Sequence, residues 1–254
     1  MAGRERKQLM ACLLLLLGMN LFPISLHADD TGLITSIEAS HKFNKKWSAA
    51  VEAEFRSRND FRTADRVSLG ADASFKILSW LKASAGYQLL IDNNREEITY
   101  QDDGLSYNNW RPSYWGARHR FNVSLTGSYK VGRVELSLRE RWQYTYRPSK
   151  VIDNFDFDEG VWEDHQVRGK GKNLLRSRLQ LEWDIPRCKF DPFASVEFHT
   201  TDKLDKTRFI VGVEHGIKKT HYLKAYYRCQ LVGGGSSDDE PNIHMLGLGY
   251  TFKF

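Results

Sequence analysis

The chain has 254 residues, and its 37 Lys and Arg side chains outnumber 32 Asp and Glu side chains, which gives a formal net charge of +5. The basic residues are interleaved with acidic ones, which excludes the clustered basic surface typical of nucleic-acid binders. Three cysteines are too few for the disulfide framework of a small secreted domain, although Cys188 and Cys229 could form one bridge.

The first 28 residues have the organisation of a secretory signal peptide. Arg4, Arg6 and Lys7 precede an apolar run at 10–19, and the small residue Ala28 marks the expected cleavage site. The run is too short for a membrane-spanning helix, which needs roughly 20 residues. An uncleaved N-terminal anchor is the alternative. Residues 29–254 show no composition shift, so we expect them to form one domain.

The rest of the chain is dominated by alternation of apolar and polar residues. In the segments 47–56 and 66–77, odd positions are mostly apolar and even positions mostly polar. The pattern continues in 81–89, 121–129, 134–144, 175–183, 223–231 and 246–254. Repeated runs of about 10 residues with aromatics near their ends predict an all-β protein, an antiparallel up-and-down transmembrane β-barrel of about 10–12 strands.

The connections between these segments alternate in length. Short turns are expected at 44–46, 78–79, 131–132, 185–189 and 218–220, and long loops at 92–118, 147–172 and 233–241. Bacterial outer-membrane barrels have short periplasmic turns and longer extracellular loops. The strands of a soluble sandwich or of a lipocalin-like barrel also alternate apolar and polar residues. Such a fold would not explain the aromatic strand ends or the difference between the two rims.

The number of segments is eleven, whereas single-chain bacterial barrels normally have an even number of strands and both termini on the periplasmic side. We therefore expect ten or twelve strands. In that case the first segment, 33–43, is not a full strand, or a long loop contains another one.

Several stretches carry a family resemblance. They are "FNKKW" at Phe43–Trp47 with the following "SAAVEAEFRSRND", "WLKASAGYQL" in the fourth predicted strand, and the terminal "GLGYTFKF". Together they resemble a domain-of-unknown-function family of small outer-membrane barrels from Bacteroidetes-type bacteria. The resemblance implies a fold and a location in the cell outer membrane, and it supplies no catalytic residues.

The last residues also resemble the end of outer-membrane proteins in general. Tyr250, Phe252 and Phe254 alternate up to the last position. This resemblance implies that the barrel-assembly machinery recognises them as an assembly signal. The other partners that we expect are outer-membrane lipid and lipopolysaccharide.

Alternation places many charged side chains inside the predicted barrel. Because buried charges persist only when paired, we expect a charge-paired, largely occluded lumen. The central cluster comprises Glu52, Glu54, Arg56, Arg66, Glu135, Arg139, Arg141, Arg176, Arg178 and Glu182, and further inward charges are Asp72, Lys76, Lys82, Arg120, Glu197, Arg208, Glu214, Lys224 and Arg228.

A narrow pore for small anionic solutes is the alternative to an occluded lumen. Arg139 and Arg141 on one strand could face Arg176 and Arg178 on the next, and rings of Arg favour anions. Glu135 and Glu182 on the same strands could neutralise them.

Glu140 tests the strand register. Alternation assigns this residue to the lipid face, where a charge is costly. We therefore expect Glu140 to lie at the outer rim beyond Trp142, or a bulge to turn it inward.

An enzyme that modifies lipids is a third hypothesis. It would need a nucleophile beside a base. The chain has no G-x-S-x-G motif, and His199 next to Thr200, His119 near Ser124, and His215 are common strand residues. The acidic segment 153–165 has oxygen ligands suited to Ca²⁺ but lacks the EF-hand order. We expect no catalytic residues, no cofactor and no metal site.

We expect any ligand of this protein to bind to the long loops, which the sequence assigns to the outside of the cell. Their aromatic side chains could stack on a sugar or a peptide, or anchor the rim in the membrane interface. The candidates are Tyr107, Trp110, Tyr114, Trp115 and Trp162, with Tyr100 beside them. The sequence thus predicts a structural or binding barrel of unknown specific function.

Overall fold

The computed structural model describes residues 30–186, 188–233 and 241–254, and the regular structure in these ranges is entirely β. No helix in the described ranges is long and apolar enough to cross a membrane. The predicted signal peptide, residues 1–28, lies outside the described residues, as does most of the loop 233–241.

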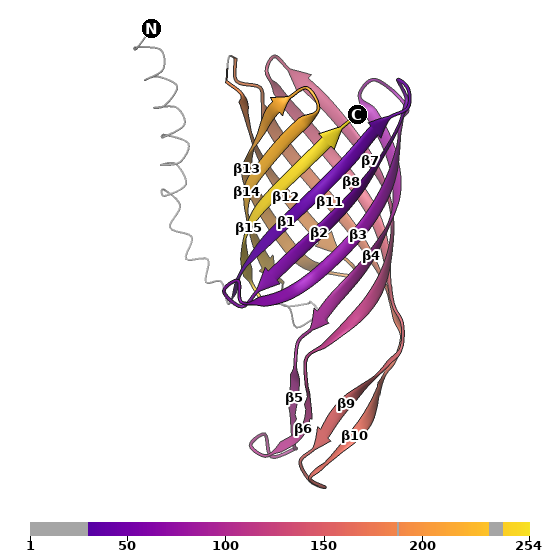
Figure 1. Cartoon of the computed structure of the whole chain (residues 1–254), viewed down its shortest axis with the longest axis vertical. Helices are drawn as coiled ribbons and strands as arrows, with labels where there is room; N and C mark the ends of the chain where they lie inside the picture. The colour runs from indigo at the N-terminus through magenta and orange to yellow at the C-terminus, as the bar shows by residue number, and fades with distance from the viewer. Residues whose placement is uncertain (1–29, 187, 234–240) are drawn as a thin grey trace, which may run out of the picture.

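Strands from both ends of the chain close into a barrel (Figure 1). Neighbouring strands pair antiparallel, except that β1 runs parallel to β15, from Asp30 opposite Ile243 to Ser40 opposite Lys253. In chain order the barrel strands are β1 (Asp30–Lys42), β2 (Trp47–Arg58), β3 (Thr63–Lys76), β4 (Leu81–Asn94), β7 (Tyr114–Val131), β8 (Val134–Arg147), β11 (Lys170–Trp183), β12 (Phe190–Thr200), β13 (Leu204–Lys218), β14 (His221–Val232) and β15 (Ile243–Lys253).

The barrel has eleven strands in the described part of the chain, so the expected even number is wrong. The segment at 33–43 belongs to a full strand, β1, which pairs with both β2 and β15. An odd number of alternating strands makes the first and last strands parallel. Asp30 and the C-terminus therefore lie at opposite rims (Figure 1), not at the same one.

The five expected short turns all lie at one rim, which we call the short-turn rim. They occupy 43–46, 77–80, 132–133, 184–189 and 219–220. The amide side chain of Asn44 accepts hydrogen bonds from the backbone N–H groups of Lys46 (2.8 Å) and Trp47 (2.9 Å), which closes the first turn. Gly132 has a φ of 59°, which suits a glycine in a two-residue hairpin turn.

Two of the long connections are not irregular loops, as the sequence suggested, but contain four additional strands. These are β5 (Glu97–Tyr100), β6 (Tyr107–Arg111), β9 (Lys150–Asp156) and β10 (Val161–Val167), in the order β10-β9-β6-β5. We call this four-stranded unit the outer sheet, and the rim from which it extends the loop rim (Figure 1). None of its strands enters the barrel wall.

The barrel wall is apolar outside and polar inside. Leu69, Val123 and Leu248 are more than half exposed on the outer surface, whereas Glu197 and Arg228 are buried in the lumen. This distribution rules out the soluble barrel, whose apolar face would point inward. A small apolar cluster of Ile34, Ile243, Met245 and Tyr226 also lies among the inward side chains.

Glu140 lies on the outer face in the middle of β8, and neither expectation for it is correct. The pairing of β8 with β7 and β11 has no register shift, and Trp142 lies closer to the loop rim than Glu140 does. The Ser177 hydroxyl, directly opposite on β11, donates a 2.6 Å hydrogen bond to the Glu140 carboxylate. This bond replaces part of the hydration that the carboxylate loses on the apolar surface.

The possible disulfide does not form. Cys188 lies in the turn between β11 and β12, Cys229 lies on β14, and both thiols are free.

Candidate functional site

Glu197 on β12 is the centre of the charge network in the lumen. The side chain is 2% exposed. Its carboxylate lies 3.0 Å from Arg139 Nη2, 2.8 Å from Arg176 Nη2 and 3.5 Å from Arg208 Nη1. His199 Nε2 completes the group at 2.7 Å. We call these five residues, contributed by β8, β11, β12 and β13, the Glu197 layer.

The strand register explains how this layer forms. Arg141 lies opposite Arg176, and Arg139 lies opposite Arg178, so the four predicted guanidiniums do face each other. Arg178 is in turn opposite Glu197 on the next strand. Two of these four arginines, Arg139 and Arg176, form ion pairs with Glu197, which the order of the strands in the sheet brings next to them.

Glu135 and Glu182, which could have neutralised these arginines, form no ion pair with them within the described residues. The two acids lie directly opposite one another near the short-turn rim. They line a water-accessible cavity, and Arg178 is the one member of the arginine cluster that also lines it. Glu197 was predicted to point inward, but nothing in the sequence indicated its central position.

Two further acids hold arginines in the lumen. Glu54 forms a 2.7 Å ion pair with Arg56, as the predicted cluster implied, and Glu52 points into the lumen two residues away. Asp92 pairs with Arg66 and, at 3.0 Å, with Arg118. The sequence placed Asp92 at the start of a loop, whereas β4 continues to Asn94 and turns this carboxylate inward.

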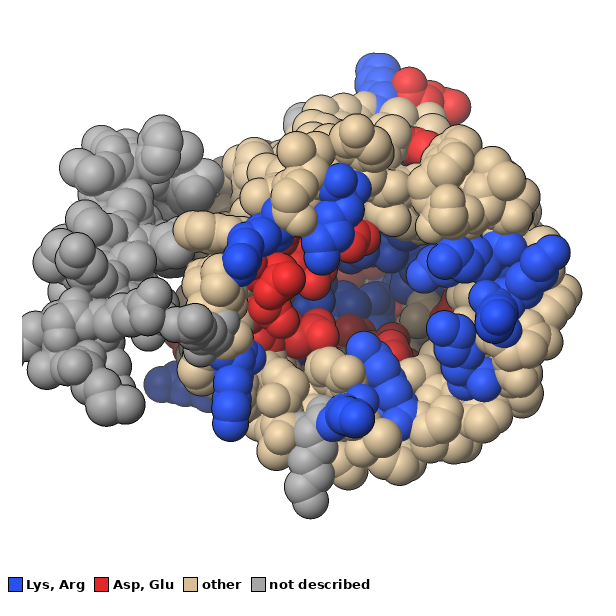
Figure 2. Space-filling model, turned by 90° about the horizontal axis from the view of Figure 1, so that it is seen from above, with Lys and Arg blue, Asp and Glu red and all other residues tan. Residues whose placement is uncertain are grey.

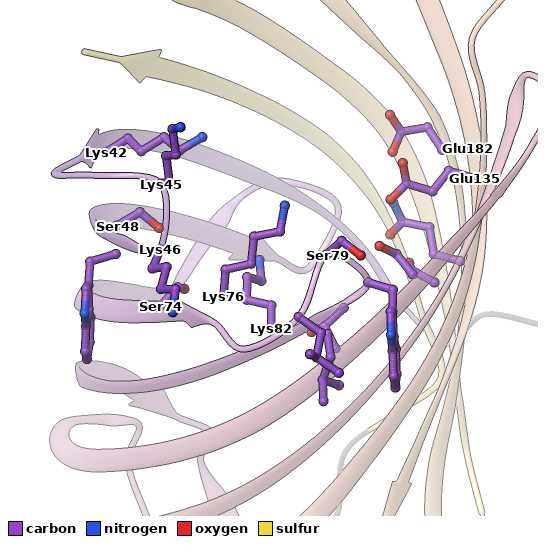
Figure 3. Close-up of a pocket in the computed structure, with 18 of the residues that line it drawn as sticks. Lys42, Lys45, Lys46, Ser48, Ser74, Lys76, Ser79, Lys82, Glu135 and Glu182 are labelled. Carbon is purple, nitrogen blue, oxygen red and sulfur yellow. The ribbon is translucent and has the colours of Figure 1, made fainter.

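The lumen opens into a cavity of about 440 Å³ at the short-turn rim, which we call the short-turn vestibule. In Figure 2 this rim is hollowed, with acidic side chains inside a border of basic ones. Figure 3 shows lysines from the first two turns and their strands on one side of the cavity and two acids on the other. These side chains are Lys42, Lys45, Lys46, Lys76 and Lys82, and Glu135 and Glu182.

A second cavity, of about 300 Å³, lies toward the loop rim. We call it the loop-side vestibule. Its lining contains one carboxylate, Asp205, which lies 3.2 Å from Lys172. The basic side chains that line it are Arg56, Arg66, Arg118, Arg120, Arg147, Arg176, Arg208, Lys170, Lys172 and Lys206.

The outer sheet carries a continuous row of aromatic rings, which we call the aromatic face. Successive ring centroids are 5.1–5.5 Å apart, a normal spacing for interacting aromatics. Four of these side chains are between 41% and 54% exposed. In the order of the contacts, the rings are Tyr100, Tyr107, Phe157, Phe155, Trp162 and Trp110.

A polar network supports the outer sheet. Asn154, 1% exposed, donates hydrogen bonds to Asn109 (2.7 Å) and Glu163 (2.6 Å) and accepts one from Arg111 (3.2 Å). Arg111 also forms an ion pair with Glu97 at 2.9 Å. These contacts join all four strands, so the aromatic face is carried by a connected unit.

The turn between β5 and β6 is closed by Asp103. The Ser106 hydroxyl and the backbone N–H groups of Leu105 and Ser106 donate to its carboxylate, and they hold the pKa of Asp103 below its usual range. Because the pKa of Asp103 is lower in the folded chain than in the unfolded chain, these hydrogen bonds stabilise the turn at any pH above the ordinary pKa of aspartate. This stabilisation is lost as the pH falls through the lowered pKa of the folded chain. The ionised Asp103 carboxylate therefore stabilises this turn at neutral pH.

The structure brings together three of the five predicted recognition residues, Tyr107, Trp110 and Trp162. Tyr114 and Trp115 lie apart from them at the start of β7, where the Lys150 ammonium is 5.6 Å from the Tyr114 ring centre and donates to the Trp115 carbonyl. Phe155 and Phe157 were missed. Their alternation in "NFDFD" is the signal of a strand in the sequence, although the acidic residues between and around them favour a loop.

The predicted assembly signal lies on and beside the last strand. Tyr250 and Phe252 are on the outer face, where Tyr250 contacts the His221 ring nitrogen at 2.7 Å. Phe254 is 60% exposed, stacks on Phe252 and contacts the His41 ring at a tilt. Thr251 and Lys253 alternate to the inside, as predicted.

The histidines considered for catalysis have separate environments. His199 is buried in the Glu197 layer. His215 is on the outer face, stacks on Phe190 and lies 2.9 Å from the Lys189 carbonyl, and His119 pairs with Tyr87. Within the described residues, no three His, Cys, Asp or Glu side chains are placed to hold a metal ion, the segment 153–165 included.

The closed wall, the apolar outer surface and the charged lumen define an outer-membrane type of β-barrel. The chain belongs to the family described as protein of unknown function (DUF2490), whose model matches residues 31–240. The predicted resemblance to a domain-of-unknown-function family of outer-membrane barrels is therefore confirmed. No curated protein matches the chain.

Three solved structures resemble the chain, and the first of them supports a shared fold. The β domain of the Bordetella autotransporter Brka has a TM-score of 0.55 and 13% identity, over 82% of this chain and 83% of that one. The NanC porin has a TM-score of 0.45 and 12% identity, over 89% and 98%. The CymD monoaromatic hydrocarbon channel has a TM-score of 0.38 and 8% identity, over 85% and 88%.

Proposed function

We propose that this protein is an outer-membrane binding barrel that captures a ligand on the aromatic face outside the cell and does not conduct solutes. The observation that carries the proposal is the aromatic face itself. Exposed apolar patches on an ordered surface mark interaction sites. Here the rings stand on a hydrogen-bonded sheet beyond the barrel, away from the wall where aromatics anchor a barrel in lipid (Figure 1).

A neutral saccharide is the ligand class that suits this surface. Flat, partly exposed rings can stack on the apolar faces of sugars, and neighbouring carboxylates accept hydrogen bonds from hydroxyl groups. Glu96, which accepts a 3.4 Å bond from the Trp110 indole, lies beside the rings, and Asp158 pairs with Gln101 at the hairpin ends.

A basic peptide is the second candidate, because the outer sheet is acidic. The segments 95–111 and 150–168 contain ten acidic and four basic residues. Such a surface attracts cations and repels anionic ligands.

Titration with saccharides and peptides, followed by tryptophan fluorescence of the purified barrel in detergent, tests the proposal. Trp110→Ala and Trp162→Ala should each weaken binding about tenfold or more, since stacked aromatics dominate such sites. The matched control is Trp115→Ala, which removes a partly exposed indole at the start of β7, outside the aromatic face. Equal losses in all three variants, or no binding to either ligand class, would overturn the proposal.

We propose the absence of conduction because buried side chains fill the lumen at the level of the Glu197 layer. The ion pairs of this layer join four neighbouring strands of the wall, and the inward side chains of Asn122, Ser124 and Gln143 are also at most 4% exposed. In planar bilayers we expect a flat current trace. Steady unitary conductance with anion selectivity would instead establish the narrow pore for anionic solutes.

We further propose that residues 1–28 direct export and that the mature barrel lies in the cell outer membrane. Its outer surface would contact lipid and lipopolysaccharide, and the barrel-assembly machinery would bind the C-terminal strand. Nucleic acid is not among the proposed partners. Cell fractionation tests the location, and recovery of soluble protein from the periplasm would contradict it.

We propose no enzymatic role. His199 is buried against Glu197 and His215 lies on the outer face, so neither is supported as a base beside a nucleophile. Lipid turnover by purified protein that is lost in His199→Ala or His215→Ala would establish the lipid-modifying alternative.

A further inference from the structure

The loop-side vestibule is lined mainly by basic side chains, ten in all. In the described part of the chain, four carboxylates pair with this lining: Asp205 within it, and Glu54, Asp92 and Glu197 as partners of lining arginines. Three lining cations, Arg120, Arg147 and Lys170, form no ion pair with any described residue. Their charges are therefore not balanced by a contacting acid.

The four carboxylates are already engaged. Glu197 is shared among Arg139, Arg176 and Arg208. Asp92 is shared between Arg66 and Arg118. The remaining two bind one lining cation each, Glu54 with Arg56 and Asp205 with Lys172.

Arg120 and Arg147 have neutral hydrogen-bond partners. Arg120 donates to Thr145 (3.3 Å) and Gln88 (3.5 Å). Arg147 donates to the Arg168 carbonyl at 3.4 Å. Both guanidiniums line the cavity. Because these hydrogen bonds are long and their acceptors are uncharged, the charges of the two guanidiniums stay available to an anion that enters from the loop rim.

We propose that the loop-side vestibule binds the phosphate group of a small soluble ligand, with Arg120 and Arg147 as its principal contacts. Guanidinium forks match the geometry of phosphate oxygens and bind them in pairs. A cavity of about 300 Å³ is at the lower end of the range for ligand sites. It suits inorganic phosphate or the phosphate monoester of one sugar. This site is separate from the aromatic face and does not depend on the proposed function.

Calorimetric titration of the purified full-length barrel in detergent tests the site. The probes are inorganic phosphate, glucose 6-phosphate and glucose, at constant ionic strength set with chloride. We expect both phosphates to bind and glucose not to bind. Arg120→Gln combined with Arg147→Gln should weaken phosphate binding at least tenfold. Lys76→Gln combined with Lys82→Gln removes the same charge from the short-turn vestibule and should leave phosphate binding unchanged.

Thermal unfolding separates a binding role from a structural one. If the two arginines serve an anion, their replacement relieves repulsion, so the variant without phosphate should be as stable as the parent or more stable. It should also lose the stabilisation that phosphate gives to the parent, because stabilisation by a ligand follows its occupancy. Unchanged phosphate affinity in the arginine variant, equal loss in the lysine variant, or no heat with either phosphate would overturn the proposal.

Discussion

At the scale of single residues, Glu197 is the side chain on which the lumen most depends. It is the carboxylate shared by three guanidiniums and a histidine in a buried position. Removing one partner of a buried ion pair leaves the other charges uncompensated, at a cost of about 3–5 kcal/mol. Glu197 therefore compensates the charges of the arginines that surround it.

Glu197→Gln should lower the free energy of unfolding by about 3–5 kcal/mol, measured by urea titration in lipid vesicles. Adding Arg139→Met should recover part of the loss, because one excess cation is removed with the acid. The control Glu135→Gln, in the open short-turn vestibule, should cost far less. Equal effects at the two positions would show that the Glu197 layer is no more important than other lumen charges.

Glu140 presents the opposite case, a charge on the apolar outer face. Its hydrogen bond from Ser177 offsets only part of the cost of placing a carboxylate there. Glu140→Leu should raise the free energy of unfolding by about 1–2 kcal/mol, because acids on the lipid face cost less than the 2–4 kcal/mol of Arg or Lys. The same urea titration measures this gain. Destabilisation would mean that Glu140 has a favourable contact outside the single chain.

At the scale of an element, β15 is shaped by an inward tyrosine of its neighbour. Gly247 lies opposite Tyr226 on β14, and a Cβ at position 247 would overlap the Tyr226 ring. The ring thereby reaches Ile34 and Met245 and contributes to the apolar cluster inside the lumen. Glycine is required at position 247 because a larger residue would overlap the Tyr226 ring. Its backbone conformation is not the reason, since its φ is not positive.

Gly247→Ala should lower the free energy of unfolding by about 1–3 kcal/mol, the usual cost of overpacking. Gly249→Ala is the control on the same strand. A Cβ there would be 3.3 Å from the Ser36 hydroxyl, which can rotate away. Urea titration of both variants tests the difference, and equal stability would show that Tyr226 moves at no cost.

At the scale of the whole molecule, the C-terminal residue belongs to the wall and, we propose, to the assembly pathway. Phe254 donates its backbone N–H to Ser40 of β1 at 3.0 Å, so it helps to close the parallel pair. Deleting Phe254 should reduce insertion into the outer membrane more than Leu246→Ala, which removes a similarly exposed apolar side chain from the same strand. Heat-modifiable gel migration of membrane fractions measures folded barrel. Equal insertion of both variants would leave Phe254 with a packing role alone.

Much of this architecture could be predicted because it depends on local pattern. The period of two fixes which side chains face lipid and which face the lumen, and the alternation of short and long links orders the rims. The strand count was wrong because the even number usual in single-chain bacterial barrels was preferred over the eleven segments that alternation indicates. The outer sheet was missed because its strands are short and rich in Asp and Asn, which normally indicate loops.

The sequence by itself determined the barrel, the orientation of every predicted lumen charge and the position of the aromatic ending. Only the tertiary structure decided that β1 pairs with β15, that Glu197 rather than Glu135 and Glu182 balances the arginines, and that six aromatics form one surface. The physical reason is that the side-chain period is a property of each strand alone. Register and closure bring together residues far apart in the chain, and those contacts set the partners of each charge and ring.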